Sequence, residues 1–204
     1  LSDIGKMYVW SHPLTGVSPC FAAGSVSVDA TSWIDANNAG FFGGNTDKYN
    51  ATCTRGQAPT NPTGKRGAGH GGAGGWGETS PGTPGAGSFD SLDWPVLCGG
   101  GGNSNYQFNW PGRGGGVLRF FVTGEVKVDG QLRANATSTG SFSGANAGGT
   151  GLVVCDRLVG SGDVQAKGGN GHQYTLGSSG HNGGAGGGGR VAIHYNPVAQ
   201  SNAT

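Results

Sequence analysis

The chain has 204 residues, of which 34% are hydrophobic, 11% are charged and 46 are glycine. Glycine normally makes up about 7% of a protein, and in regular structure it costs about 0.5–1 kcal/mol relative to alanine, so an ordinary helical globule is excluded. Collagen is excluded because no Gly-X-Y period is present. The net charge is +1, from 12 basic and 11 acidic residues spread singly, so no nucleic acid is expected as a partner. No run of 18 apolar residues is present, so no membrane span is expected.

The first part of the chain predicts a short strand and then one complete repeat. Tyr8-Val9-Trp10 and the prolines within residues 11–19 are typical of a strand that ends in a turn. From Cys20 to Val28 apolar residues alternate, which places one set of side chains on one face of a strand. We expect residues 20–40 to form the first rung, meaning one turn of a β-solenoid. Because the chain opens at Leu1 without a signal-like apolar block, we also expect a mature or excised piece of a larger precursor.

Residues 41–116 lack this alternation and predict a long excursion between rungs. They contain the glycine-rich run 67–75, two of the four cysteines and three of the five tryptophans. A structureless connection of this length would count against the assignment, but free loops rarely carry so much aromatic surface. We therefore expect an ordered flap pinned to the solenoid. Anchoring the flap is the simpler role for its tryptophans, and glycan stacking on Trp94 and Trp110 is the alternative.

The clearest repeat lies between residues 117 and 168. Seven positions recur 32 residues later, and they pair Phe120 with Leu152, Val122 with Val154, Val126 with Leu158, Val128 with Gly160, Gly130 with Gly162, Leu132 with Val164 and Ala134 with Ala166. Such spacing is typical of stacked repeats, so we predict rungs at 117–140 and 150–168. The same pattern links Cys20 and Ala22 to Phe120 and Val122, and it links Val191 and Ile193 to Leu152 and Val154. The second of these links predicts a fourth, partial rung at 189–196.

Together the repeats predict an all-β fold in one domain, residues 1–204. We expect a parallel, right-handed β-helix of about four short rungs with a long glycine-rich, disulfide-pinned flap over residues 41–116. No apolar stripe at helical spacing is present, so no helix is expected. The glycine runs are expected to cross between rungs in polyproline-II-like or tightly turned conformations, where the missing Cβ permits close packing.

The order of the glycine-rich motifs resembles a known family. The motifs are Gly-Ala-Gly-His-Gly-Gly at 67–72, Pro95 before Gly99–Gly102, Gly-Gly-Gly-Val-Leu at 114–118, Val-x-Val-Asp-Gly at 126–130, Gly-Gly-Thr-Gly-Leu at 148–152 and Gly-Gly-Gly-Gly-Arg-Val-Ala-Ile-His-Tyr at 186–195. Over residues 20–195 the chain resembles the glycine-rich β-helix modules of large secreted and cell-surface proteins of algae, oomycetes, plants and some bacteria. The resemblance implies an extracellular structural or adhesive role, in algae within surface filaments such as flagellar hairs, and it implies no catalytic residues.

Cysteines and glycosylation motifs also indicate an extracellular location. Cys20, Cys53, Cys98 and Cys155 are widely spaced and form no C-x-x-C pair, so we expect two disulfides rather than a zinc site. We favour Cys20 with Cys53 and Cys98 with Cys155, and the other two connectivities stay open. Attached N-glycans are expected at three acceptor asparagines, which are Asn50, Asn135 and Asn202.

No residue pattern predicts catalysis, a cofactor or a metal site. Gly67-x-Gly69-x-x-Gly72 lacks the flanking strand and helix of a dinucleotide-binding motif. The calcium-binding glycine repeat has one imperfect match, at 168–173, and a calcium ion at Asp90 with Asp93 is the less favoured alternative to turn roles for these carboxylates. Asp29 and Asp129 hold equivalent positions in two rungs, which suits turn stabilisation better than the facing carboxylates of a glycosidase. The histidines show no ligand spacing.

Two functional hypotheses result. The leading one is a non-enzymatic structural subunit or module of an extracellular, cell-surface glycoprotein that assembles into a filament or larger surface array. The ends of a β-helix present unpaired backbone to copies of the chain or to neighbouring domains, and neither end of this sequence shows a helical or charged cap. The alternative is a carbohydrate-binding or carbohydrate-active β-helix module that uses the tryptophan-rich flap.

Overall fold

The structure, a computed structural model, describes residues 1–43, 65–77, 85–102, 112–138, 143–172 and 182–201. Their regular secondary structure is almost entirely strand in parallel sheets, with almost no helix, so the fold is all-β as predicted. The strands are β1 (Lys6–Tyr8), β2 (Phe21–Ala23), β3 (Val26–Val28), β4 (Trp33–Asp35), β5 (Val117–Val122), β6 (Glu125–Val128), β7 (Gln131–Arg133), β8 (Thr150–Cys155), β9 (Arg157–Val159), β10 (Asp163–Gln165) and β11 (Arg190–Tyr195). One short helix, α1 (Pro197–Ser201), follows β11.

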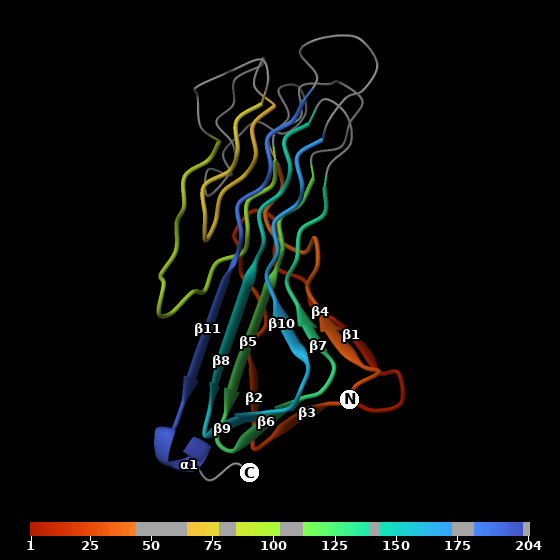
Figure 1. Cartoon of the computed structure of the whole chain (residues 1–204), viewed down its shortest axis with the longest axis vertical. Helices are drawn as coiled ribbons and strands as arrows, with labels where there is room; N and C mark the ends of the chain where they lie inside the picture. The colour runs from red at the N-terminus through yellow and green to blue at the C-terminus, as the bar shows by residue number, and fades with distance from the viewer. Residues whose placement is uncertain (44–64, 78–84, 103–111, 139–142, 173–181, 202–204) are drawn as a thin grey trace.

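The strands visit three sheets in turn. Sheet A has the order β1-β4-β7-β10, sheet B the order β11-β8-β5-β2, and sheet C the order β3-β6-β9. All the pairings within these sheets are parallel. The chain therefore forms three successive triplets, β2–β3–β4, β5–β6–β7 and β8–β9–β10, each of which gives one strand to each sheet. Figure 1 shows the three sheets around a triangular space at one end of the molecule.

The triplets fall within the predicted rungs, but the predicted alignment is wrong by one residue in sheet B. In sheet C, Val126 lies opposite Leu158, at the predicted spacing of 32 residues. In sheet B, Phe120 lies opposite Val153 rather than Leu152. Leu152 and Val153 are both fully buried although they face opposite sides of the sheet. Alternation of apolar residues identifies the inner face of a strand only when the other face is exposed. Because both faces of β8 are buried, the sequence pattern could not show which residues point inward.

The same one-residue shift occurs in the other two sheet B alignments. Phe21, not Cys20, lies opposite Phe120, and Ala192, not Val191, lies opposite Leu152. The inward side chains of sheet B are therefore Phe21, Phe120, Val153 and Ile193, which are aligned across the four strands, and the residues two positions before or after each of them.

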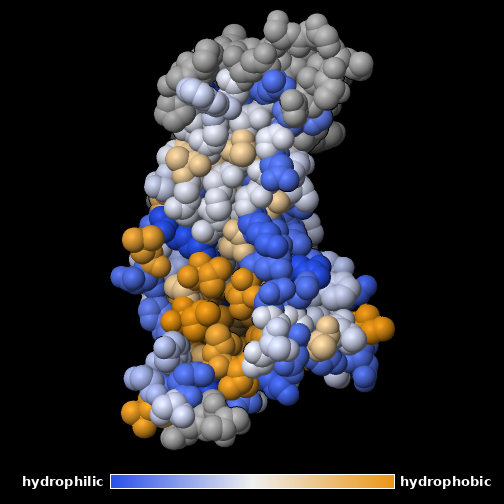
Figure 2. All heavy atoms as spheres, in the orientation of Figure 1, coloured by the Kyte–Doolittle hydropathy of each residue, from blue (hydrophilic) through white to orange (hydrophobic). Residues whose placement is uncertain are grey.

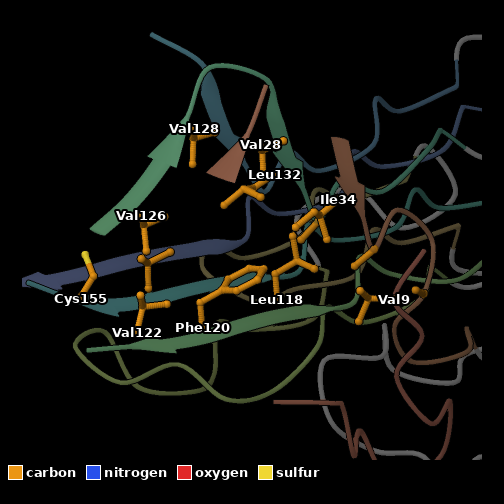
Figure 3. Packing of buried hydrophobic residues seen from close by; sticks show 14 residues of the cluster. Val9, Val28, Ile34, Leu118, Phe120, Val122, Val126, Val128, Leu132 and Cys155 are labelled. Atoms are coloured by element: carbon orange, nitrogen blue, oxygen red, sulfur yellow. The ribbon is translucent and has the colours of Figure 1, made fainter. Parts of the chain in front are cut away.

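The space between the sheets holds the hydrophobic core (Figure 3). Phe120 is 2% exposed and stacks on Phe21 with ring centroids 5.3 Å apart. Sheets A and C contribute Leu132, Val126 and similar branched side chains from β3, β4, β6 and β7. Equivalent positions of consecutive triplets thus carry similar apolar side chains that pack against one another in the core. This packing explains why the repeat is visible in the sequence.

Beyond the sheets, glycine-rich segments run side by side as extended chains (Figure 1). We call them the glycine bundle, which comprises residues 36–43, 65–77, 85–88, 98–102, 112–116, 134–138, 143–149, 166–172 and 182–189. Its segments are joined by backbone hydrogen bonds to several neighbours each. Gly67 bonds to Gly75 and Ala86, while Ala68 bonds to Ala145 and Gly187. A strand within a sheet has only two neighbours, so the bundle is not a sheet.

Glycine is required in the bundle because backbones lie where a side chain would be. A Cβ built on Gly144 would lie 1.8 Å from the carbonyl oxygen of Arg66, and one on Gly67 would lie 1.8 Å from that of Ala185. Real Cβ atoms do not approach backbone this closely, so neither position accepts a side chain without rearrangement. The predicted use of glycine for close packing is confirmed at these positions.

The described parts of residues 41–116 lie in two different places. Residues 65–77 and 112–116 belong to the glycine bundle, and residues 89–97 lie on the outer face of sheet B.

The prediction of no helix is wrong, because α1 follows β11. Asn196 Oδ1 accepts the N–H groups of Val198 and Ala199 and so caps the N-terminus of this helix.

Candidate functional site

The predicted disulfides are not formed. Cys20, Cys98 and Cys155 carry free thiols, and Cys53 lies outside the described residues. Cys98 lies under the outer face of sheet B with Phe41 and Val117, whereas Cys155 belongs to the core between the sheets. The even number of cysteines and their wide spacing in the sequence do not show that Cys98 and Cys155 lie on opposite sides of sheet B. The residues 89–97 are therefore held to sheet B without a disulfide among the described cysteines.

One of the three predicted glycosylation sites lies within the described residues. Asn135 stacks with its counterpart in the preceding triplet: Asn37 Oδ1 accepts the N–H of Asn135, and Asn135 Oδ1 accepts the N–H of Lys167. Its Nδ2 atom, to which a glycan would be attached, donates to Gln165 Oε1 at 3.1 Å. Glycosylation would replace one of the two hydrogens on Nδ2 and leave the other as a donor, so glycosylation of Asn135 stays a prediction. Asn50 and Asn202 lie outside the described residues.

Trp94 anchors residues 89–97 to sheet B. Its ring lies 5.9 Å from that of Phe121 and 4.9 Å from that of His194, both on the outer face. His194 Nε2 bonds to the carbonyl oxygen of Asp93 at 2.6 Å, and Arg190 Nε donates to that of Phe89 at 2.9 Å. Trp94 remains 45% exposed. These contacts fit the anchoring role predicted for Trp94, and Trp110 lies outside the described residues.

The carboxylates considered for catalysis stabilise turns. Asp29 accepts the N–H groups of Asp3 and Thr31, and Asp129 accepts the N–H of Ser161. A side-chain hydrogen bond from Ser32 lowers the pKa of Asp29, and one from Lys127 lowers the pKa of Asp129. Both residues therefore hold the corners between sheets, as predicted.

Asp90 lies in residues 89–97 and accepts hydrogen bonds from backbone N–H groups of that segment. Its Oδ2 accepts the N–H groups of Val96 and Leu97 and lies 3.4 Å from His70 Nε2. His70 is fully buried, and its Nδ1 lies 2.8 Å from the carbonyl oxygen of Gly148. This pair joins residues 89–97 to the glycine bundle. The sequence pointed to Asp90 only together with Asp93, and not to its pairing with His70, because these two residues are 20 positions apart in irregular segments.

Within the part of the chain that the structure describes, no group of three or more histidine, cysteine, aspartate or glutamate side chains could hold a metal ion. The same residues contain no helix long and apolar enough to cross a bilayer.

The most distinctive surface is the C-terminal end of the three sheets, where the core is open. Val191, Ile193 and Tyr195 of β11 are 43%, 37% and 52% exposed. They face inward, because Ile193 lies opposite Val153 and Tyr195 opposite Cys155, both of which are core residues. Figure 2 shows hydrophobic atoms gathered where the sheets meet at this end.

This apolar surface extends from sheet B to the other two sheets. Val191 lies over Gly151, where Val164 of β10 also approaches. Leu158 of β9 and Val164 are only partly buried, although they pack against the core. The β11 side chains that continue the core outward at this end, Val191, Ile193 and Tyr195, are thus exposed. We refer to Leu158, Val164, Val191, Ile193 and Tyr195 as the open end.

Sheet C is partly covered at the open end by α1. Gln200 Oε1 accepts the N–H of Leu158 at 2.9 Å, and Gln200 Nε2 donates to the carbonyl oxygen of Leu158 at 3.0 Å. The carboxamide thereby takes the place of one residue of a further strand. The prediction that neither end has a helical cap is therefore wrong for sheet C. Among the described residues no strand pairs beyond β10 in sheet A or beyond β11 in sheet B at this end.

The N-terminal end is more closed. The amino group of Leu1 donates to the carbonyl oxygen of Ser27, and the carbonyl oxygen of Leu1 accepts the N–H of Asp29, so the N-terminus covers one end of β3. Met7, Phe21 and other first-strand side chains are partly buried. Within the described part of the chain, β1 and β2 are the edge strands of sheets A and B at this end.

The sequence predicted a partial final rung at 189–196 but not the consequence that its apolar side chains lie uncovered. The available signal was the abrupt end of the repeat after a single strand. Comparison of the chain with known protein families, with curated proteins and with solved structures finds no match in any of the three.

Proposed function

We propose that the chain is a structural module of an extracellular, cell-surface glycoprotein, built as a right-handed parallel β-helix, that assembles into a filament or larger surface array. Three triplets that each give one strand to the same three sheets, in the same order, support the β-helix. The general right-handedness of parallel crossover connections supports the hand.

The observation that carries the structural role is the open end. Its core-facing side chains Val191, Ile193 and Tyr195 are exposed beside the free edge of β11. Exposed apolar surface and unpaired strand edges both favour association with another chain. Asp29 and Asp129, which were considered for a sugar-cleaving site, accept backbone hydrogen bonds in turns, and Asp90 accepts the N–H of Val96.

The extracellular location rests on the resemblance of the glycine motifs and on the acceptor asparagines Asn50, Asn135 and Asn202. The free thiols of Cys20, Cys98 and Cys155 withdraw the support that disulfides would have given. Secretion from a eukaryotic host, followed by intact-mass measurement before and after N-glycosidase treatment, tests this part of the proposal. Absence of any glycan mass would contradict it.

Sedimentation velocity over a wide concentration range, together with electron microscopy, tests assembly. We expect oligomers that grow with protein concentration and appear as elongated particles. A protein that stays monomeric at the highest concentration would overturn the structural proposal.

The carbohydrate-binding alternative has one supporting observation, the 45% exposure of Trp94. A glycan array with the wild type and a Trp94→Ala variant tests it. Binding that is lost in the variant would favour this alternative, and no binding by the wild type would remove it.

A further inference from the structure

We propose that copies of this chain join head to tail, with β1 and β2 of one copy docked in register on β10 and β11 of the next. This inference rests on the proposed structural function and names the two surfaces that would carry it. Strand positions, register and charge at the two ends of the sheets support it.

The two ends of the three-sheet structure have complementary shapes, because each end has one sheet that extends one strand further than the other two. At the C-terminal end, sheet B extends by one strand, β11, beyond the last triplet. At the N-terminal end, sheet A extends by one strand, β1, before the first triplet. If β1 of a second copy pairs with β10, it lies at the level of β11, and β2 of that copy then lies on β11. Strand order in both sheets continues across the junction without a gap or an overlap.

The register of sheet A brings opposite charges together. The position of Lys6 continues through Trp33 and Gln131 to Asp163. One further step in the same register places Lys6 of the second copy beside Asp163. Both side chains belong to exposed residues at the free edges of the sheet, and opposite charges on neighbouring strands are favourable. On the inner face the same step places Met7 over Val164.

The register of sheet B covers the open end. The inward position of Phe21 continues through Phe120 and Val153 to Ile193. The next step places Phe21 of the second copy over Ile193, as it already lies over Phe120 within its own chain. In the same register Ala23 faces Tyr195, so a small side chain meets the largest one of β11. Ile193 and Tyr195, which are exposed in a single copy, would thus be buried between the sheets of the two joined copies.

Sheet C accommodates the junction because its two coverings lie at different places. Helix α1 bonds to Leu158, whose position in the sheet is that of Val126 and Val26. The N-terminus bonds to Ser27 and Asp29, further along the strand. The helix of one copy and the N-terminus of the next therefore cover opposite ends of sheet C. Pairing across the junction is needed only in sheets A and B.

Disulfide trapping tests the register directly. A Tyr8→Cys, Gln165→Cys variant in a Cys20→Ser background places two thiols opposite one another only across the junction. Neighbouring strands lie about 4.8 Å apart, within disulfide range, whereas β4 and β7 separate these positions within one copy. We expect a ladder of covalent dimers and higher oligomers after mild oxidation, with the bond between the two introduced thiols identified by mass spectrometry. The control Lys6→Cys, Gln165→Cys is out of register by two residues, and an equal ladder from it would overturn the proposal.

Association measured by sedimentation velocity provides the second test. Ile193→Asp would place a charge in the joined core, and we expect association to weaken by about 100-fold or more. The matched control is Leu92→Asp, at an exposed apolar residue within residues 89–97, and we expect no change. Asp163→Lys should weaken association by about threefold, and the double variant Lys6→Asp, Asp163→Lys should restore it.

The outcomes separate the two proposals. If the wild type associates but Ile193→Asp behaves like Leu92→Asp and no ladder forms, copies join through another surface and the head-to-tail docking is wrong, while the structural function stands. If the wild type and the trapping variant stay monomeric at every concentration, both proposals fail.

Discussion

His70 Nε2 lies 3.4 Å from Asp90 Oδ2, and this contact joins the segment that covers sheet B to the interior of the glycine bundle. His70 is fully buried and its ring also lies 4.8 Å from that of Phe89. The same carboxylate accepts two backbone N–H groups, those of Val96 and Leu97. One acidic side chain therefore fixes both ends of the covering segment.

The first prediction concerns the pH dependence of this contact. Burial raises the pKa of Asp90, but hydrogen bonds from His70, Leu97, Ser91 and Val96 outweigh it, so the pKa lies below the ordinary value of 3.8. A carboxyl group whose pKa is lowered by folding stabilises the fold above its unfolded pKa, and this contribution is lost as the pH falls through the folded pKa. We expect hydrogen-exchange protection of the amides of Val96 and Leu97 to decrease below about pH 4.

Asp90→Asn should abolish that pH dependence and lower the protection at neutral pH. Asp93→Asn, in the same segment, is the matched control. Equal effects of the two variants would show that the Asp90 contact does not hold the segment.

The second prediction concerns the backbone packing of the glycine bundle. Gly144→Ala would bring a methyl group to 1.8 Å from the carbonyl oxygen of Arg66, whereas a Cβ at Gly87 meets no atom within 4 Å. Overpacking of this kind costs about 1–3 kcal/mol or more. We expect chemical denaturation to show a loss of this size for Gly144→Ala and almost none for Gly87→Ala. Equal stabilities would contradict this close approach of backbones.

The third prediction concerns cysteine reactivity. Burial raises the pKa of the Cys98 thiol to about 12, and only the thiolate reacts with alkylating agents. At pH 8 we expect Cys98 to react with iodoacetamide about 1,000-fold more slowly than an unperturbed thiol, and to react normally once the protein is unfolded. The exposed Cys20 in the same molecule is the internal control. Peptide mass spectrometry measures both rates, and equal rates would contradict the burial of Cys98.

The fourth prediction concerns the core between the sheets. Phe120 contacts Phe21 of the preceding triplet and is almost completely buried. Phe120→Ala should lower the free energy of unfolding by about 3–5 kcal/mol. Phe121→Ala removes an equal side chain from the outer face of the same strand, where Phe121 is only partly buried beside Trp94. We expect a smaller loss for it in denaturant unfolding, and an equal loss would mean that the two faces contribute alike.

The repeats predicted the strand triplets because like side chains lie over one another. Val126 and Leu158, and likewise Leu132 and Val164, pair at the predicted spacing in sheets whose outer faces are exposed or polar. In sheet B the same reasoning gave the wrong inward residue, because residues 89–97 bury the outer face as well. Which face of Leu152 is covered depends on a segment far away in the sequence, and no local pattern contains that information.

The candidate surface was less predictable than the fold. Val191 and Ile193 were recognised as strand residues, but their exposure depends on which elements pack over them in space. The Gln200 carboxamide that covers Leu158 lies in a helix of five residues, too short to leave an apolar stripe in the sequence. The predicted pairing of Cys98 with Cys155 is wrong for a related reason, since cysteine spacing carries no information about which side of a sheet each thiol occupies.

The glycine bundle has a thermal consequence that sets it apart from the three sheets. Its interior is mostly main chain, so unfolding it exposes mainly peptide groups, whose hydration lowers the heat capacity, whereas unfolding the sheets exposes apolar side chains, whose hydration raises it. Apolar burial weakens on cooling, and peptide hydrogen bonding between segments of the glycine bundle does not share that dependence. On cooling, the sheet end of the molecule should therefore lose stability before the glycine end, so the two halves of one chain have different temperature optima.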